Sequence, residues 1–158
     1  MDCCAPTGRL PLSVADLSTG EQLLLWAIRT RLEGRDRLGK VQEAFALAAH
    51  PHPGSVFACF EPWFLVLSSH ARRDLLLHRA PCPCVSADEL AMVQLVATQQ
   101  AGAPARSAEL ARDLVEPGMV DALLETAGTL AAALGRLGLV LPQRRTLLRP
   151  SPASAQLH

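Results

Sequence analysis

The sequence predicts an all-α domain of about six helices, and two observations lead to this prediction. Apolar residues recur every three or four positions over most of the chain, which is the period of an amphipathic helix. Two Ser-x-x-Glu sequences, at 18–21 and 86–89, match the capping box that begins a helix. We therefore expect a single helical domain at 18–141, between an extended lead-in at 1–17 and a disordered tail at 142–158.

The first half of the chain is expected to hold four helices, at 18–34, 36–49, 54–67 and 71–79. Asp36 is expected to cap the second helix, and the prolines after residue 49 to end it. The third helix is almost entirely apolar, and we take it as the centre of the core. Pro62 either bends this helix or lies in the first turn of a helix that begins near Glu61.

The second half is expected to hold a helix at 86–100, a shorter one at 106–115 and a last one at 118–137. Gly138 suits the position after a helix C-terminus, where a left-handed backbone is common. Residues 139–141 are expected to pack back on the bundle, and Gln94 to lie on an exposed helix face. The predicted core includes Phe57, Phe60, Trp63, Phe64, Leu76, Val93, Leu124 and Leu130.

Composition narrows the function classes. At 158 residues with 49% hydrophobic residues, the chain can bury a core without disulfides, and it is more apolar than a monomer needs. Its net charge of zero argues against nucleic-acid binding, because such proteins usually present a basic face to phosphates. Fourteen arginines stand against one lysine, a bias typical of bacterial genes rich in G and C.

The sequence also gives an expected location. No apolar run approaches the roughly 20 residues needed to span a bilayer, and no secretory signal is visible. We therefore expect a cytoplasmic protein, in which the five cysteines would be free thiols or metal ligands before they would be disulfides.

A crowd of histidine and cysteine residues is the sharpest chemical feature of the sequence. Residues 50–84 hold four of the five histidines and three of the five cysteines. Imidazole and thiolate are the ligands that zinc prefers. The predicted zinc ligands are His78, Cys82 and Cys84, and the candidates for a fourth ligand are Cys59, His70, His50 and His52.

Two other interpretations of this cluster stay open. Cys82 and Cys84 could cycle between dithiol and disulfide, with Cys84 activated near a helix N-terminus, although redox pairs usually have Cys-x-x-Cys spacing. Alternatively, the cysteines are small buried hydrophobes and His78 only favours a helix C-terminus.

No known catalytic motif is present, neither a phosphate-binding glycine loop nor a nucleophile elbow nor a zinc-protease helix. The chain is therefore predicted to be a non-enzymatic adaptor or regulatory protein that acts through protein contacts, as a homodimer or with another protein. Apolar residues around Trp26 and at 134–141 exceed what one core uses. The alternative is a metal-binding protein with structural zinc, or a thiol-redox protein. A helix-turn-helix at 86–116 is disfavoured by its balanced charge.

Overall fold

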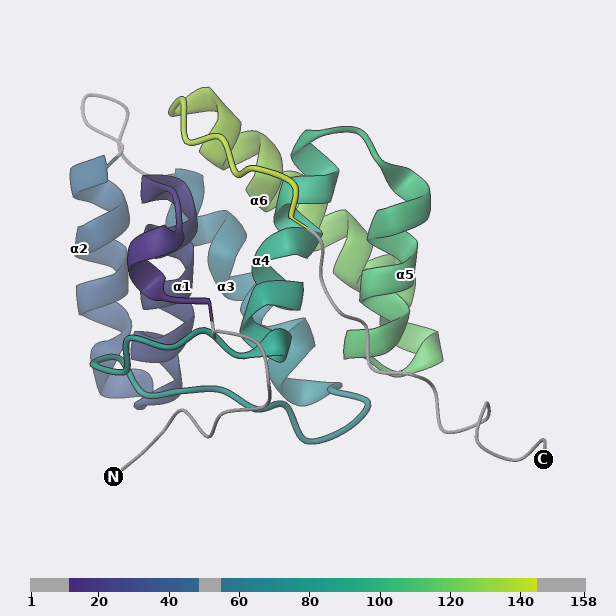
Figure 1. The fold of residues 1–158 in the computed structure, drawn as a ribbon, viewed down its shortest axis with the longest axis horizontal. Coiled ribbons are helices and arrows are strands. Elements are labelled where there is room, and N and C mark those ends of the chain that lie inside the picture. Colours follow the sequence, from purple (N-terminus) through teal and green to yellow (C-terminus); the bar gives the residue numbers. More distant parts are fainter. Residues whose placement is uncertain (1–11, 49–54, 145–158) are drawn as a thin grey trace.

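The computed structural model describes residues 12–48 and 55–144, and these form a bundle of six α-helices (Figure 1). The helices are α1 (Thr19–Leu32), α2 (Leu38–Ala48), α3 (Ser55–Ser69), α4 (Ala87–Gln100), α5 (Pro104–Leu114) and α6 (Val120–Arg136). Three 3-10 turns accompany them: η1 (Val14–Asp16), η2 (Arg35–Arg37) and η3 (Pro117–Met119). Over the described ranges there is no strand, only two isolated bridges, so the all-α prediction is confirmed.

The six helices form one continuous set of contacts. α1 and α2 lie at one end of the bundle and α5 at the other, with α4 between them (Figure 1). α3 packs mainly on α6, and α4 packs on both α5 and α6. The described part of the chain contains no helix with the length and apolarity that crossing a membrane requires.

Both predicted capping boxes are present. Ser18 and Ser86 each accept a hydrogen bond from the backbone N–H three residues later, and the glutamate at that position accepts one from the serine N–H. The predicted end of the last helix is also confirmed, because Gly138 follows α6 with a φ of 72°. These local signals fixed helix ends correctly because each uses groups within a few residues of one another.

The core prediction is confirmed for most residues. Phe60, Trp63 and Phe64 are buried on α3, as are Val93 on α4 and Leu130 on α6. Phe57 and Leu124 are partly buried and pack against this core. Leu76 is the exception, since 56% of it is exposed.

The predicted cap of α2 is wrong, and the position of Pro62 decides between its two interpretations. Asp36 does not cap α2; it lies inside η2, where its carboxylate is 3.6 Å from the Arg37 guanidinium, and the chain enters α2 through this 3-10 turn. Pro62 lies inside α3, which begins at Ser55 and not near Glu61. The first-turn interpretation of Pro62 is thereby excluded.

The helix predicted at 71–79 is also wrong. Residues 74–79 have no regular secondary structure and run across the bundle in an open path. The backbone N–H groups of Leu76 and His78 donate to carboxylates of Asp88 and Glu89 in α4, and not to carbonyls four residues earlier. Tertiary hydrogen bonds thus replace the local ones that a helix would need.

Described residues on both sides of the predicted helical domain at 18–141 also contact it. Leu12 and Val14 in the lead-in exchange backbone hydrogen bonds with Val85 and Pro83. At the other end, Arg144 is ion-paired with Glu21, so the chain is packed beyond residue 141. The rest of the predicted tail, 145–158, lies outside the described residues.

Candidate functional site

The most distinctive part of the molecule is the loop of residues 70–86 between α3 and α4. It runs out beneath α1, turns, and returns to the start of α4 (Figure 1). A path of this length with only isolated bridges needs partners for its backbone. Leu12, Val14 and Leu114 supply some of them, and the first turn of α4 and one arginine of α1 supply many of the others.

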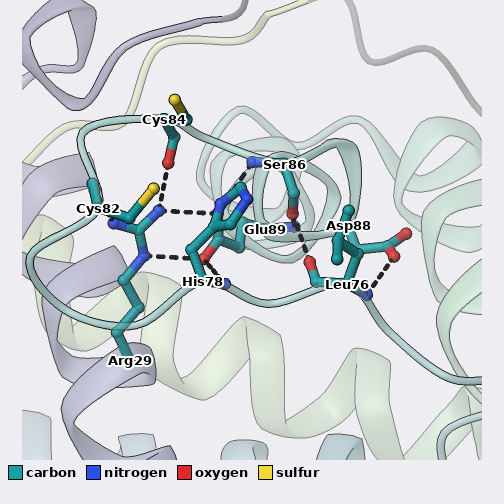
Figure 2. Close-up of polar contacts among 8 residues, drawn as sticks. All are labelled: Arg29, Leu76, His78, Cys82, Cys84, Ser86, Asp88 and Glu89. Carbon is teal, nitrogen blue, oxygen red and sulfur yellow. Dashed lines mark hydrogen bonds and ion pairs between the residues drawn. The ribbon is translucent and has the colours of Figure 1, made fainter. Parts of the chain in front are cut away.

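Arg29 of α1 is the centre of this anchorage. Its side chain is 2% exposed, and Nε and Nη2 each donate to one carboxylate oxygen of Glu89 at 2.8 Å. Nη1 also donates to the carbonyl of Cys82 at 2.6 Å, and Nη2 to the carbonyl of Cys84 (Figure 2). One buried guanidinium therefore joins α1, residues 82–84 of the loop and α4.

Glu89 is the matching acceptor and is fully buried. Besides Arg29, it accepts hydrogen bonds from the backbone N–H groups of His78 and Ser86, and His78 Nδ1 lies 3.1 Å from its Oε2. Burial raises the pKa of the Glu89 carboxyl, but hydrogen bonds from Arg29, Ser86 and His78 outweigh burial, and the pKa lies below its ordinary value. Glu89 is thus a carboxylate that the loop and α1 both need in its charged form.

Asp88 and Ser86 bind the first part of the loop, at Arg73 and Leu76. Asp88 accepts from the N–H of Leu76 at 2.7 Å and from Arg73 at 2.7 Å. The Ser86 hydroxyl, which caps α4, also donates to the carbonyl of Leu76 (Figure 2). Arg73 reaches further, to Asp113 of α5 at 2.9 Å. Ser86 and the first turn of α4 therefore cap this helix and also hold the loop in place by hydrogen bonds.

The structure separates most of the predicted zinc ligands. His78 is turned to Glu89 (Figure 2), and His70 lies 4.0 Å from Glu116 at the other end of the loop. Cys59 belongs to α3. No group of three or more His, Cys, Asp or Glu side chains that could hold a metal exists within 12–48 and 55–144. His50 and His52 lie outside these ranges.

The cysteine chemistry also differs from expectation. Cys84 is disulfide-bonded, whereas Cys59 and Cys82 are thiols, so Cys82 and Cys84 are not joined to each other. A disulfide sulfur is not the thiolate that zinc binds, so the zinc hypothesis stays a prediction that requires reduced Cys84. Metal analysis of the reduced protein tests it, with Cys82→Ser and Cys84→Ser as controls.

Sequence reasoning missed Arg29 and part of the role of Glu89. Arg29 lies on the polar side of the helical pattern at 18–34, and nothing nearby in the sequence indicates a partner 60 positions away. The capping box did identify Glu89, but only for its contact with Ser86. A carboxylate in a capping box has a second oxygen to offer, and that was the available signal.

Arg29 lines two hollows. The first, here the Trp26 hollow, has a volume of about 200 Å³ and is lined by Val14, Gln22, Leu25, Trp26, Arg29 and residues 80–83. The second, here the 75–79 groove, has a volume of about 700 Å³ and is lined by Arg29, Leu32, Glu33, Arg37, Leu75, Leu77, His78 and Arg79. Arg29 and Glu89 neutralise each other's charge. A molecule in either hollow would therefore be contacted mainly by the other side chains that line it.

No protein-family model matches the chain, and comparisons with curated proteins and with solved structures gave no significant match.

Proposed function

We propose that the chain is a non-catalytic adaptor or regulatory protein that acts by contact with another protein or a second copy of itself. The observation that carries the proposal is Trp26 beside its hollow. Trp26 is 36% exposed, and the adjoining wall contains Val14, Pro81 and Pro83. Tryptophan beside a concave apolar surface is typical of the residues that dominate the binding energy of protein interfaces.

The rigidity of the hollow supports the same proposal. Its far wall, residues 80–83, contains two prolines whose φ angles are fixed by their rings. Arg29 holds the carbonyls of Cys82 and Cys84 on either side of Pro83. A surface that is already ordered loses little conformational entropy when a partner binds, which favours affinity. We expect an interface of at least about 1,000 Å² in total, the usual minimum for a specific contact.

Site-specific photo-crosslinking tests the proposal. A photoreactive phenylalanine analogue is placed at position 26 in cells of the natural host, and at position 47 as the control. Leu47 is a suitable control because it is 75% exposed on α2 and does not line the hollow. We expect a discrete adduct at position 26 that is absent at position 47. Its mass, followed by peptide sequencing, distinguishes a second copy from another protein.

The adduct must then be shown to reflect affinity. Binding of the identified protein to the purified chain should weaken by about 30-fold with Trp26→Ala, equivalent to about 2 kcal/mol for a central interface residue. Leu47→Ala should leave binding unchanged. Equal adducts at both positions, or equal effects of the two substitutions, would contradict the proposal.

A further inference from the structure

We infer that the 75–79 groove binds an extended segment of a partner protein, which pairs with the backbone of residues 75–79 as an added β-strand. This inference rests on the proposed function and specifies the conformation and chemistry of one partner segment. It concerns a surface separate from the Trp26 hollow, although Arg29 lines both.

The first support is an alternation in the backbone hydrogen bonds. Leu76 and His78 donate their N–H groups to α4, and the Leu76 carbonyl accepts from Ser86. In an extended chain, successive backbone groups point to opposite sides. The backbone groups of Leu75 and Leu77 therefore point away from α4.

Within the described part of the chain, neither the N–H nor the C=O of Leu75 or Leu77 makes a hydrogen bond, and neither does the N–H of Arg79. A row of unpaired backbone groups with the repeat of a strand is a template for pairing with another chain. Recognition by strand addition uses such an edge for affinity and the flanking side chains for specificity.

The second support is that this edge borders an open groove and not a packed helix. The groove of about 700 Å³ separates residues 75–79 from the end of α1 and from η2. Its opposite wall is formed by Leu32, Glu33 and Arg37. A hollow of this size is within the range that proteins use to hold ligands, about 300–1,000 Å³.

The third support comes from the side chains, which indicate the chemistry of the occupant. Leu75 and Leu77 are half-buried, and Leu32 is 44% exposed in the same groove. Arg79 is exposed and has no ion pair among the residues of the described ranges. The groove therefore suits a segment whose apolar residues alternate along one face and which carries a carboxylate opposite Arg79.

Selection from a random library of ten-residue peptides against the full chain tests this inference. We expect enriched peptides to have alternating apolar residues and at least one acidic residue. Amide resonances of Leu75, Leu77 and Arg79 should shift on binding. N-methylation of alternate amides along one edge of the peptide should weaken binding at least tenfold, because it removes the donors that pair with the groove, whereas N-methylation along the other edge should not.

A pair of variants provides the matched control in the protein. Leu77→Pro removes an N–H that bonds to no residue of 12–48 or 55–144, whereas Leu77→Ala keeps that N–H and also lacks the leucine side chain. We expect Leu77→Pro to bind the selected peptides at least tenfold more weakly than Leu77→Ala. Should Leu77→Pro fail to fold, the N-methylated peptides carry the same test without altering the protein.

Several outcomes would overturn the inference: no enriched peptide, peptides bound as helices, resonance shifts at Trp26 in place of residues 75–79, or equal affinity of the two Leu77 variants. A dimer of this chain formed through residues 75–79 would overturn the assignment to a partner protein. The adduct at position 26 is independent of these results. A clear adduct without strand-forming peptides would contradict only this inference, and a missing adduct only the proposed interface at Trp26.

Discussion

Arg29 shows how much one side chain can determine. A buried guanidinium is stable only when its charge is neutralised and its N–H groups are bonded, and Glu89 with two carbonyls meets both needs. The same contacts fix the position of Cys82 and Cys84, and with them the wall of the Trp26 hollow. Stability and the shape of the surface thus depend on the same residue.

Arg29→Met should therefore be strongly destabilising. The substitution leaves Glu89 charged and buried without its main partner, which costs about 3–5 kcal/mol. Arg37→Met is the control, because Arg37 is 39% exposed and lies 3.8 Å from Glu33; it should change stability by less than about 1 kcal/mol. Urea unfolding measures both. Equal losses for the two variants would show that the Arg29–Glu89 pair does not anchor the fold.

Acid should weaken the fold through the same pair. Burial raises the pKa of Glu89, yet its hydrogen bonds hold the pKa below the ordinary value, so the carboxylate stabilises the folded state above the unfolded pKa of about 4.3. That stabilisation is lost as the pH falls through the folded pKa. The free energy of unfolding should thus decrease below about pH 4.3. Glu89→Gln should flatten this decrease.

The pKa of Glu21 is also below its ordinary value, so Glu21 keeps part of the acid dependence of stability in the Glu89→Gln variant. Burial raises the pKa of Glu21, but hydrogen bonds from Arg144 and Ser18 outweigh burial. Urea unfolding at a series of pH values should therefore show a reduced slope in Glu89→Gln and a still smaller one in Glu89→Gln with Glu21→Gln. An unchanged slope in the single variant would contradict the role given to Glu89.

At the scale of elements, the helices with local start signals were predictable and the loop was not. The capping boxes at Ser18 and Ser86 and the glycine after α6 each depend on neighbouring residues. The segment 71–79 has the composition of a helix, but its backbone is bonded to Asp88 and Glu89, which follow it by 11 or 12 positions. Tertiary hydrogen bonds override local preference here, and no periodicity in the sequence reports them.

The candidate site was predictable only in outline. His78, Cys82 and Cys84 were predicted as site residues from the sequence, and they do belong to the loop that lines both hollows. The helix predicted at 71–79, which would have placed His78 near its C-terminus, does not exist, and zinc binding by these residues stays a prediction. The apolar residues around Trp26 were judged to exceed what one core uses, and Trp26 is indeed 36% exposed.

The two capping serines should differ in their contribution to stability. Ser18→Ala should cost about 1 kcal/mol, the usual loss of an N-cap. Ser86→Ala should cost roughly 1 kcal/mol more, because the Ser86 hydroxyl also donates to the Leu76 carbonyl. Hydrogen exchange at the amides of Leu76 and His78 should rise only in Ser86→Ala. Equal losses of stability in the two variants and unchanged hydrogen exchange would show that the Ser86 hydroxyl does not hold the loop in place.

At the scale of the whole molecule, distant parts of the chain close on one another. Arg144 donates to both carboxylate oxygens of Glu21, at 2.7 and 2.9 Å. Gln94, predicted to be exposed, is 1% exposed because its amide bonds Pro142 and Arg144. The last described residues therefore complete the bundle by covering α1 and α4.

Arg144→Met should accordingly weaken the whole fold. It leaves the buried Glu21 carboxylate without its guanidinium, at a cost of about 1–3 kcal/mol. Arg136→Met is the matched control, since Arg136 is exposed at the end of α6, and its effect should be within about 0.5 kcal/mol. Thermal unfolding followed by circular dichroism measures both variants. Melting temperatures that fall equally would exclude a specific role for the Arg144–Glu21 pair.

The 75–79 groove also links the amount of folded protein in the cell to the partner that binds it. Its two walls come from residues 29–37 and 75–79, which face each other only after α1 and the loop have docked. An unfolded or nascent chain therefore has no groove, and a partner segment binds the folded state alone. By mass action, such a partner at 100 times its Kd would add about 2.7 kcal/mol to the free energy of unfolding. The abundance of the folded protein would then follow the abundance of its partner.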